Sequence, residues 1–409
     1  MKGDQLRVGF FGVLGSGNLG NDVSLDAIVS YLHEQHPDVQ LRFLGMGPER
    51  LAERYGAPAT HLQWYEANLE RFSSVPAPVL KIIGRILDPF RALRWARNLD
   101  VAVVPGMGIL ETTVPMRPWG FPYGLFTTCA AARISGAKVA LVCVGADLIR
   151  KRLTRLLITG SARLAHYRSY RDHRSLEAMR TMGIDVSADQ VYPDLAFGHP
   201  TPSTAPDGSG AVGLGLMDYW GTNDERTEAL ALRRAYLTTM TRFAGWLLDR
   251  GRPVRFLICD PMDEAVINQA IDDLREARPY LPSSMVIFEP AETLQALMKQ
   301  MVGLDAVVGT RYHNVVGAVQ LNLPTISISY SGKHDELMAG MGLAEFCQPA
   351  RSVEFDRLVE QFTELEQRAE ELRVSMVSAN ERNREQVGRQ FSALSQLLGV
   401  PTRSEVGTR

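Results

Sequence analysis

An arginine and a histidine stand two residues apart in GTRYHNVVGAVQ, the segment that begins at Gly309. The preceding LDAVV is typical of a buried strand, and VVGAVQ is typical of a helix. Backbone N–H groups at a helix N-terminus lack intrahelical partners and attract anions. Arg311 adds a planar cation suited to a carboxylate or phosphate, and His313 adds a side chain of the type that exchanges protons near neutral pH. The segment therefore predicts an anion-binding site that contains an acid or base.

A capping or core role is the alternative for His313. On an extended loop, however, side chains two residues apart project to the same side, which favours a shared task with Arg311. Three further residues are predicted to bind substrate here: Asn314 beside the histidine, and Tyr330 and Lys333 after the next strand, PTISISY. A solvated position at a helix start is the alternative for Lys333.

A glycine loop, GVLGSGNLGND, links the first expected strand to the first expected helix. Its Gly-x-Gly-x-x-Gly spacing is that of the dinucleotide fingerprint, which also requires an acidic residue at the end of the second strand. That strand ends in LRFLG, so we disfavour an NAD site. We instead predict that Gly17, Gly20 and Asn18 contact substrate. Asp22 is a candidate catalytic base, with helix capping as its alternative.

The segment SYRDHRSLEAM carries a further candidate. Arg171 lies where a strand is expected to end and a helix to begin, so its guanidinium is predicted to bind a carboxylate or phosphate of the substrate. For Asp172 and Ser175, capping of that helix explains their presence as well as a role in function would.

Apolar strands alternate with helices along the chain, which predicts the α/β class with parallel sheets covered on both faces. We expect two doubly wound, Rossmann-like domains that face each other across a cleft, with ligands beyond the carboxyl ends of the strands. The expected parts are an N-terminal α/β domain over 1–200, a linker over 201–210, a C-terminal α/β domain over 211–350 and a helical segment over 351–409.

The helical segment is expected to cross back onto the N-terminal domain and to end in a disordered tail. Helices of the second domain are expected to begin near Asp224, Asp263, Ala291 and His313.

The chain has 409 residues, with 44 Lys and Arg against 46 Asp and Glu. This near balance argues against a globally basic surface for nucleic acid. The four cysteines form no CxxC pair and are expected to be reduced, and no His, Asp and Glu cluster has metal-ligand spacing. No apolar run is long enough to span a membrane and the N-terminus leaves no room for a signal peptide, so we expect a cytoplasmic protein.

The three motifs, in this order, resemble the polysaccharide pyruvyl transferase family over most of residues 7–343. The most specific match is GTRYHNVVGAVQLNLPTISISYSGKHDELMAGMGL. The resemblance implies a two-domain fold like that of GT-B glycosyltransferases. It also implies transfer of the pyruvyl group of phosphoenolpyruvate onto two sugar hydroxyls, which makes a cyclic ketal, releases phosphate and needs no organic cofactor. The chain departs from the family in its first loop, Asn18–Asp22, and in PGMGILETT, so the acceptor is not implied.

The same resemblance implies roles for the candidate residues. Arg311 and Arg171 would hold phosphoenolpyruvate, together with the helix start. His313 would be the general acid that protonates the methylene carbon or the departing phosphate. Asn18, Asp22 and the glycine loop would line the acceptor side in the N-terminal domain, with Asp22 as the base.

Two other functions stay open. A GT-B glycosyltransferase that uses a nucleotide sugar could hold a pyrophosphate with the same arginine and helix start. A non-catalytic membrane-surface or assembly protein is suggested by residues 76–99, where basic and apolar side chains alternate. Helices that pack on the sheet and are broken at Pro89 are the more ordinary explanation for that segment.

The predicted partners are therefore phosphoenolpyruvate and a hydroxylated acceptor, such as a sugar or a lipid-linked glycan. Peripheral contact with the inner face of the membrane and a homo-oligomer are further expectations. Nucleic acid is not expected to bind.

Overall fold

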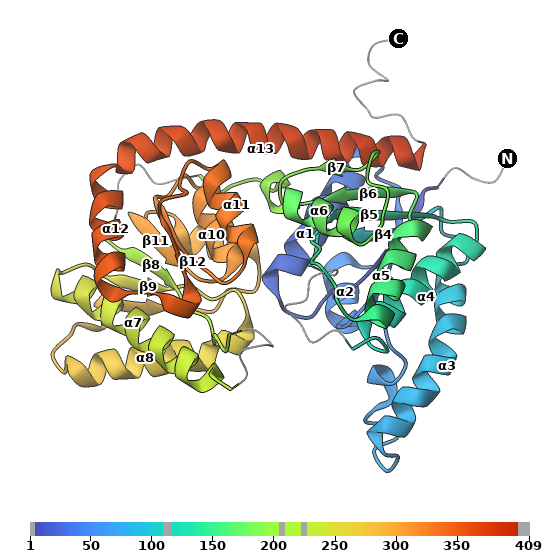
Figure 1. Cartoon of the computed structure of the whole chain (residues 1–409), viewed down its shortest axis with the longest axis horizontal. Helices are drawn as coiled ribbons and strands as arrows, with labels where there is room; N and C mark the ends of the chain where they lie inside the picture. The colour runs from blue at the N-terminus through green and yellow to red at the C-terminus, as the bar shows by residue number, and fades with distance from the viewer. Residues whose placement is uncertain (1–4, 109–116, 204–208, 222–226, 400–409) are drawn as a thin grey trace, which may run out of the picture. The chain divides into compact units, whose positions relative to one another are not determined.

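The computed structural model describes residues 5–108, 117–203, 209–221 and 227–399. The chain divides into two compact units (Figure 1). Unit 1 comprises Met1–Ser16, Asn21–Gly198 and Gln386–Arg409, and unit 2 comprises Gly17–Gly20 and His199–Glu385.

Four sequence expectations concern residues outside the described ranges. They are the middle of the linker at 204–208, the helix start near Asp224, residues 109–113 of PGMGILETT and the tail at 400–409.

Unit 1 is built on a sheet of seven parallel strands in the order β3-β2-β1-β4-β5-β6-β7. The strands are β1 (Arg7–Phe11), β2 (Gln40–Gly45), β3 (Ala59–His61), β4 (Val101–Pro105), β5 (Lys138–Val144), β6 (Tyr167–Tyr170) and β7 (Gln190–Val191). The central strands β1, β4 and β5 are apolar and almost entirely buried, as expected of strands that helices cover on both faces.

The helices of unit 1 follow the strands in alternation. They are α1 (Leu19–Gln35), whose first two residues group with unit 2, α2 (Pro48–Tyr55), α3 (Ala77–Ala96), α4 (Phe121–Ile134), α5 (Arg152–Leu164) and α6 (His173–Thr181), with 3-10 turns at Glu66–Asn68 and Leu195–Gly198. The side chain of Asp172 accepts the N–H of Ser175, so the capping role offered for Asp172 is confirmed.

Unit 2 repeats this architecture on a sheet of six strands in the order β10-β9-β8-β11-β12-β13. The strands are β8 (Val212–Gly215), β9 (Val254–Phe256), β10 (Val286–Phe288), β11 (Ala306–Gly309), β12 (Thr325–Ser329) and β13 (Cys347–Pro349). All strand pairings among the described residues of both sheets are parallel, so the predicted doubly wound α/β class is confirmed.

The helices of unit 2 are α7 (Ala229–Asp249), α8 (Glu264–Ala277), α9 (Leu294–Met301), α10 (Tyr312–Gln320), α11 (Gly332–Gly340) and α12 (Phe355–Gln367), with 3-10 turns at Pro261–Asp263, Ser283–Met285 and Ala350–Ser352. Helix α13 (Ala369–Leu398) begins in unit 2 and ends in unit 1. Among the residues that the structure describes, no helix combines the length and the apolar character needed to span a bilayer.

The structure corrects the expectation that Pro89 breaks the helix in residues 76–99, because α3 runs through it as one helix. Proline has no N–H to offer the carbonyl oxygen four residues earlier, which is that of Arg85. The hydroxyl of Tyr123 on α4 donates a hydrogen bond to that oxygen at 2.8 Å. The carbonyl therefore keeps a partner, and the helix continues.

The C-terminal part of α13 is bonded to the sheet of unit 1 through Gln390. Ser169 Oγ donates to Gln390 Oε1 at 2.6 Å, and Gln390 Nε2 donates to the Tyr167 hydroxyl at 2.9 Å. Both Gln390 and Ser169 are fully buried. The next residue, Phe391, stacks on Tyr31 of α1 with ring centroids 4.6 Å apart. One amide thus ties the end of the chain to β6.

Replacing Gln390 with alanine removes the buried partner of two hydroxyls, so the free energy of unfolding should fall by about 1–3 kcal/mol. Urea denaturation followed by circular dichroism measures the change. Gln386→Ala is the matched control, because it removes the same side chain from an exposed position of the same helix. It should stay within about 0.5 kcal/mol of the wild type. Equal losses in the two variants would contradict a structural role for the Gln390 amide.

Candidate functional site

Arg311 and the helix start predicted to hold an anion lie at the carboxyl edge of the sheet in unit 2. The strand order reverses between β8 and β11, and ligands of doubly wound sheets bind at such a switch point. Arg311 follows β11 and precedes α10 with an extended backbone, φ −70° and ψ 134°. Helix α10 begins at Tyr312, so the helix start predicted near His313 is confirmed. The first turn of α10 therefore stands at the switch point.

Arg311 is held by a carboxylate to which the sequence analysis gave no role. Its Nε donates to Oδ2 of Asp263 at 2.6 Å, and its Nη2 donates to Oδ1 at 2.7 Å. The Asp263 side chain is fully buried, and that of Arg311 is 18% exposed. Asp263 Oδ1 also accepts the backbone N–H of Asp218 at 2.9 Å. This bidentate pair fixes the plane of the guanidinium.

The pair also fixes the charge of Arg311. Burial lowers the pKa of Arg311, but the hydrogen-bonded carboxylate of Asp263 raises it by more, so the pKa lies above its ordinary value. A second carboxylate oxygen, Oδ2 of Asp260, lies 3.8 Å from Nη2. The sequence predicted that the Arg311 guanidinium could bind an anion through two N–H groups. In the structure Nε and Nη2 already bind Asp263, so an anion would meet the Nη1 end of the guanidinium.

Four residues of the glycine loop, Gly17–Gly20, belong to unit 2. Asn18 Nδ2 donates to Oδ2 of Asp260 at 3.1 Å, and the N–H of Leu19 donates to the carbonyl oxygen of Cys259 at 3.3 Å. The loop therefore binds the segment that follows β9, beside the carboxylates that surround the arginine. This differs from the expectation that the loop lines only the N-terminal domain.

Two glycines of this loop, Gly17 and Gly20, are required for different physical reasons. Gly17 has φ 86°, in the left-handed region that favours glycine. Gly20 approaches the imidazole of His313 so closely that any Cβ at this position would overlap the ring. Asn18 Oδ1 accepts the N–H of Gly20 at 3.0 Å and so holds the close approach in place. The loop thus fixes one side of the His313 ring.

Aromatic rings and a lysine surround the first turn of α10. The ring of Tyr312 meets those of His313 and His334 edge-on, with centroids 5.1 Å and 5.4 Å away. Tyr330 packs against His334 at 4.7 Å. Lys333 Nζ lies 5.3 Å from the Tyr312 centroid and 5.5 Å from that of Tyr330. The structure therefore brings the predicted Tyr330 and Lys333 into one cluster with His313.

Asn314, also predicted to bind substrate, is fully buried. Its Nδ2 donates to the carbonyl oxygen of Leu257 at 3.3 Å, and its Oδ1 accepts from the thiol of Cys259. A Cβ at Gly215 on β8 would overlap its amide. Through these contacts the Asn314 amide joins α10 to β8 and to the segment after β9.

The two remaining predicted site residues, Asp22 and Arg171, lie in unit 1. Asp22 on α1 is 6% exposed, and its Oδ1 accepts the N–H of Gly15 at 3.0 Å. Burial raises the pKa of Asp22, and the hydrogen bond from Gly15 opposes that shift only in part. Arg171 follows β6 and is 9% exposed, with its Nε 3.7 Å from Oδ2 of Asp172.

Sequence reasoning missed three residues of the unit 2 cluster. Asp260 and Asp263 follow the strand FLIC, and an acidic residue directly after a buried strand is a signal that could have found the first of them. His334 is fully buried, and its Nδ1 lies 3.0 Å from Ser327 Oγ. In the sequence it looked like one polar residue among several in SGKHDEL.

The part of the chain that the structure describes contains no group of three or more His, Cys, Asp or Glu side chains arranged to hold a metal ion. Cys129, Cys143 and Cys259 are buried free thiols, as predicted from their apolar surroundings.

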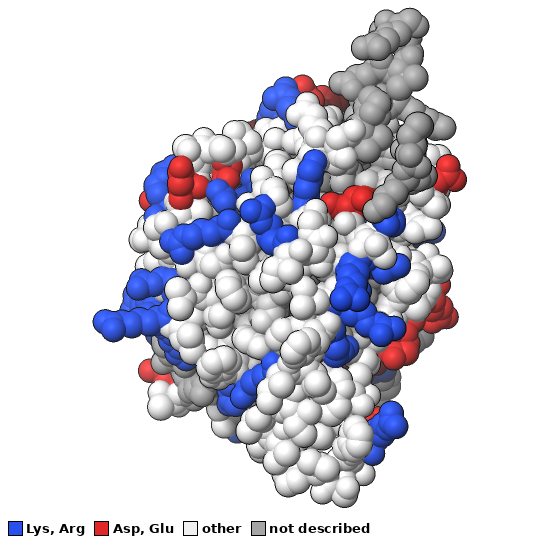
Figure 2. All heavy atoms as spheres, turned by 90° about the vertical axis from the view of Figure 1, so that its right-hand side faces the viewer, with Lys and Arg blue, Asp and Glu red and all other residues white. Residues whose placement is uncertain are grey.

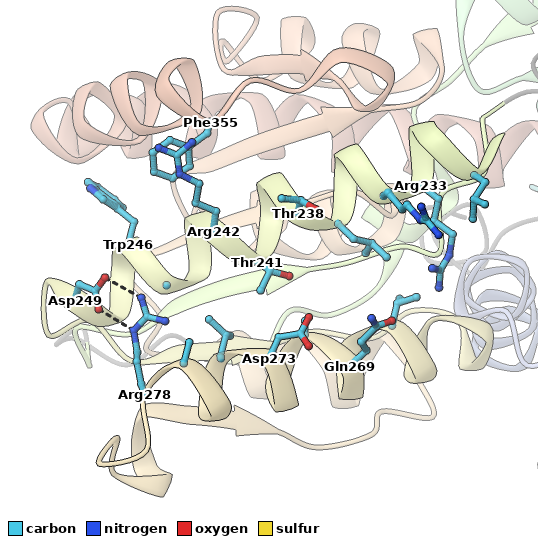
Figure 3. Close-up of a pocket in the computed structure, with 18 residues that line it drawn as sticks. Arg233, Thr238, Thr241, Arg242, Trp246, Asp249, Gln269, Asp273, Arg278 and Phe355 are labelled. Atoms are coloured by element: carbon cyan, nitrogen blue, oxygen red, sulfur yellow. Dashed lines mark hydrogen bonds and ion pairs between the residues drawn. The ribbon is translucent and has the colours of Figure 1, made fainter. Parts of the chain in front are cut away.

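A groove of about 720 Å³ lies elsewhere on unit 2, between α7 and α8 (Figure 3). None of the predicted site residues lines it. Three of its arginines already have partners. Arg278 binds both oxygens of Asp249, Arg233 binds Asp218, and Arg242 lies over the ring of Phe355. The groove is therefore separate from the predicted site residues.

The two parallel doubly wound sheets form a two-domain α/β fold like that of solved GT-B glycosyltransferases. A sequence profile described as Polysaccharide pyruvyl transferase matches residues 18–332. The chain therefore belongs to the polysaccharide pyruvyl transferase family, which is a family of transferases. The family and the enzyme class predicted from the motifs are confirmed.

Solved structures share the fold at low sequence identity. The glycosyltransferase SnogD from Streptomyces nogalater is 16% identical, with 96% of this chain and 99% of SnogD covered and a TM-score of 0.54. The S. aureus MnaA–UDP co-structure is 10% identical, with 97% and 99% covered and a TM-score of 0.60. UDP-GlcNAc 2-epimerase from Neisseria meningitidis, bound to UDP-GlcNAc, is 12% identical, with 96% and 99% covered and a TM-score of 0.55. No curated protein matches the chain.

Replacing Asp263 with asparagine should lower the free energy of unfolding by about 3–5 kcal/mol, because Arg311 keeps its charge in a buried place after its partner is removed. Denaturation midpoints in urea measure the loss. The matched control is Asp249→Asn, which breaks the same bidentate geometry in a pair whose aspartate is 63% exposed. The control should lose only about 0–1 kcal/mol. If the two variants lose the same amount, the Arg311–Asp263 pair does not hold the site together.

Proposed function

We propose that this transferase moves the pyruvyl group of phosphoenolpyruvate onto two hydroxyls of a sugar or glycan-like acceptor, forming a cyclic ketal and releasing phosphate. Membership of the family supports the pyruvyl transfer. The observation that carries the donor assignment is the convergence of Arg311, His313, Lys333 and Tyr330 on one helix start at the switch point of unit 2.

Phosphoenolpyruvate carries a carboxylate and a phosphate, so its site must supply positive charge and N–H donors. Arg311 offers the Nη1 end of a guanidinium that Asp263 already orients. Lys333 offers a second cation beside the Tyr312 and Tyr330 rings. The first turn of α10 adds the positive end of a helix dipole. Arg171 is a further proposed ligand for the donor.

The proposed reaction forms two C–O bonds, and a proton must be transferred in each of these steps. The methylene carbon of phosphoenolpyruvate gains one proton, which makes the adjacent carbon electrophilic, and one acceptor hydroxyl adds there and loses its proton. The second hydroxyl then displaces phosphate, and its proton leaves with the departing group. The products are a ketal with a methyl group and inorganic phosphate, so atoms and charges balance. No organic cofactor takes part in this proposal.

His313 is the proposed general acid. Its ring lies between Tyr312 and the backbone of Gly20, so its position does not depend on the substrate. A side chain already in place loses little freedom when the substrate binds, which favours proton transfer. Asp22 is the proposed base for an acceptor hydroxyl, and Asn18 and Gly17 are proposed to contact the acceptor. A cytoplasmic location belongs to the same proposal.

Calorimetric titration of phosphoenolpyruvate should show binding to the wild type and to His313→Gln, and loss of binding in Arg311→Ala. The arginine supplies charge to the anion, whereas the histidine acts on the reacting carbon. His33→Ala, at an exposed position of α1, is the control and should bind like the wild type. UDP and a UDP-sugar are titrated in parallel, because MnaA is described with UDP. If only UDP or the UDP-sugar gives a heat of binding, the donor is a nucleotide sugar and the pyruvyl-donor proposal is wrong.

Phosphate release from phosphoenolpyruvate, measured with a panel of glycan acceptors, should fall by about 10²–10⁴-fold in His313→Gln. Gly20→Ala should also slow release while phosphoenolpyruvate still binds, because its Cβ displaces the imidazole. Gly340→Ala is the control, since a Cβ there meets nothing within 4 Å. Full activity in His313→Gln would show that His313 is not the general acid. The donor assignment would then be tested by the calorimetric titration alone.

A further inference from the structure

Helix α3 of unit 1 exposes a row of large apolar side chains. The exposed fractions are 44% for Val79, 56% for Ile82, 37% for Ile83, 62% for Ile86 and 67% for Phe90. Their spacing of three, four and seven residues places them on one side of the helix. We call these five residues the α3 face.

The α3 face is additional to the side of the helix that packs on unit 1. Leu80, Gly84, Ala92 and Trp95 are buried on the opposite side and already join α3 to the core. A helix that only covers a sheet needs one apolar stripe, with polar residues on the solvent side. The second stripe of α3 is therefore not required by the fold.

Neighbouring helices extend the exposed apolar surface. Helix α3 packs on α4 and α4 packs on α5, so the three lie side by side in unit 1. Trp119, just before α4, is 50% exposed, and Leu153 and Leu156 on α5 are 39% and 62% exposed. Figure 2 views the side of the molecule that carries these helices and shows wide uncharged areas among Lys and Arg side chains. Exposed apolar surface on this scale marks an interaction site in soluble proteins.

Basic residues outnumber acidic ones around the α3 face, although Glu66 lies near Lys81 and Arg91. Helix α3 contains Lys81, Arg85, Arg91 and Arg94 but a single acidic residue, Asp88, which pairs with Arg91 at 2.8 Å. Helix α5 carries three further arginines and no acidic residue. Two lysine or arginine residues, 150 and 151, precede it directly. The apolar row thus lies within a basic rim.

We propose that the α3 face is a peripheral membrane-docking surface for anionic lipid. An amphipathic helix lying in the headgroup region buries apolar side chains in the acyl boundary and places Lys and Arg against lipid phosphates. A second copy of this chain is a poorer partner, because a symmetric contact would bring two basic rims together. The surface would hold unit 1 at a membrane, where a lipid-linked acceptor is found. The docking itself is independent of the proposed function.

The test is co-sedimentation of the full chain with vesicles of phosphatidylcholine alone and of phosphatidylcholine with phosphatidylglycerol. The wild type should bind the anionic vesicles, bind the neutral ones weakly and be released by salt. The double variant Ile86→Asp/Phe90→Asp should bind on the order of tenfold less. Lys81→Gln should bind about fivefold less, because each basic residue at an anionic surface contributes about that factor.

Val374→Asp is the matched control, because it places the same charge at an apolar position that is 69% exposed on α13 in unit 2. It should bind anionic vesicles like the wild type. Circular dichroism and melting temperature check that the variants keep the fold. Absence of wild-type binding to anionic vesicles overturns the proposal. A wild-type dimer that Ile86→Asp/Phe90→Asp converts to a monomer, without lipid binding, overturns it in favour of self-association.

Discussion

Parallel strand pairing is the constraint on which both units depend. Strands that run in one direction need a crossover between neighbours, and the helices of those crossovers cover both faces of the sheet. The polar loops are left at the sheet edges, and those that follow the strands gather at the carboxyl edge. In unit 2 this edge collects the residues after β9, β11 and β12, which are distant in sequence. The location of the site therefore follows from the topology of the sheet.

Within that edge, the buried pair of Arg311 and Asp263 decides what the site can do. A carboxylate with no exposed surface is tolerated because it accepts two guanidinium N–H groups and one backbone N–H. The same pair orients the guanidinium and reduces the net positive charge presented to an anion. Lys333 and the first turn of α10 then supply attraction that the arginine alone does not. In the proposed function, donor binding and structural stability depend on the same ion pair.

The apolar residues of helix α3 form two surfaces, one buried and one exposed. Its apolar residues are too many for one stripe, so one set packs on unit 1 and the other is exposed. Pro89, which lies between them, does not end the helix because Tyr123 on another helix replaces the missing hydrogen bond. A local rule about proline was overridden by a tertiary contact. The exposed row with its basic rim then resembles the membrane-facing side of an interfacial helix.

The sequence by itself determined the α/β class, the main strands and the helix start after Thr310, because buried parallel strands are continuous apolar runs and the motif at 309–314 has a strong local pattern. It did not show β3, β7 or β13, because two or three residues at a sheet edge carry no periodic signal. Only the tertiary structure decided that Asp263 holds Arg311, that Gly20 touches His313 and that the Asn314 amide is buried and bonded to Leu257. These contacts join residues from separate crossovers, and distance along the chain says nothing about which loops meet at one edge.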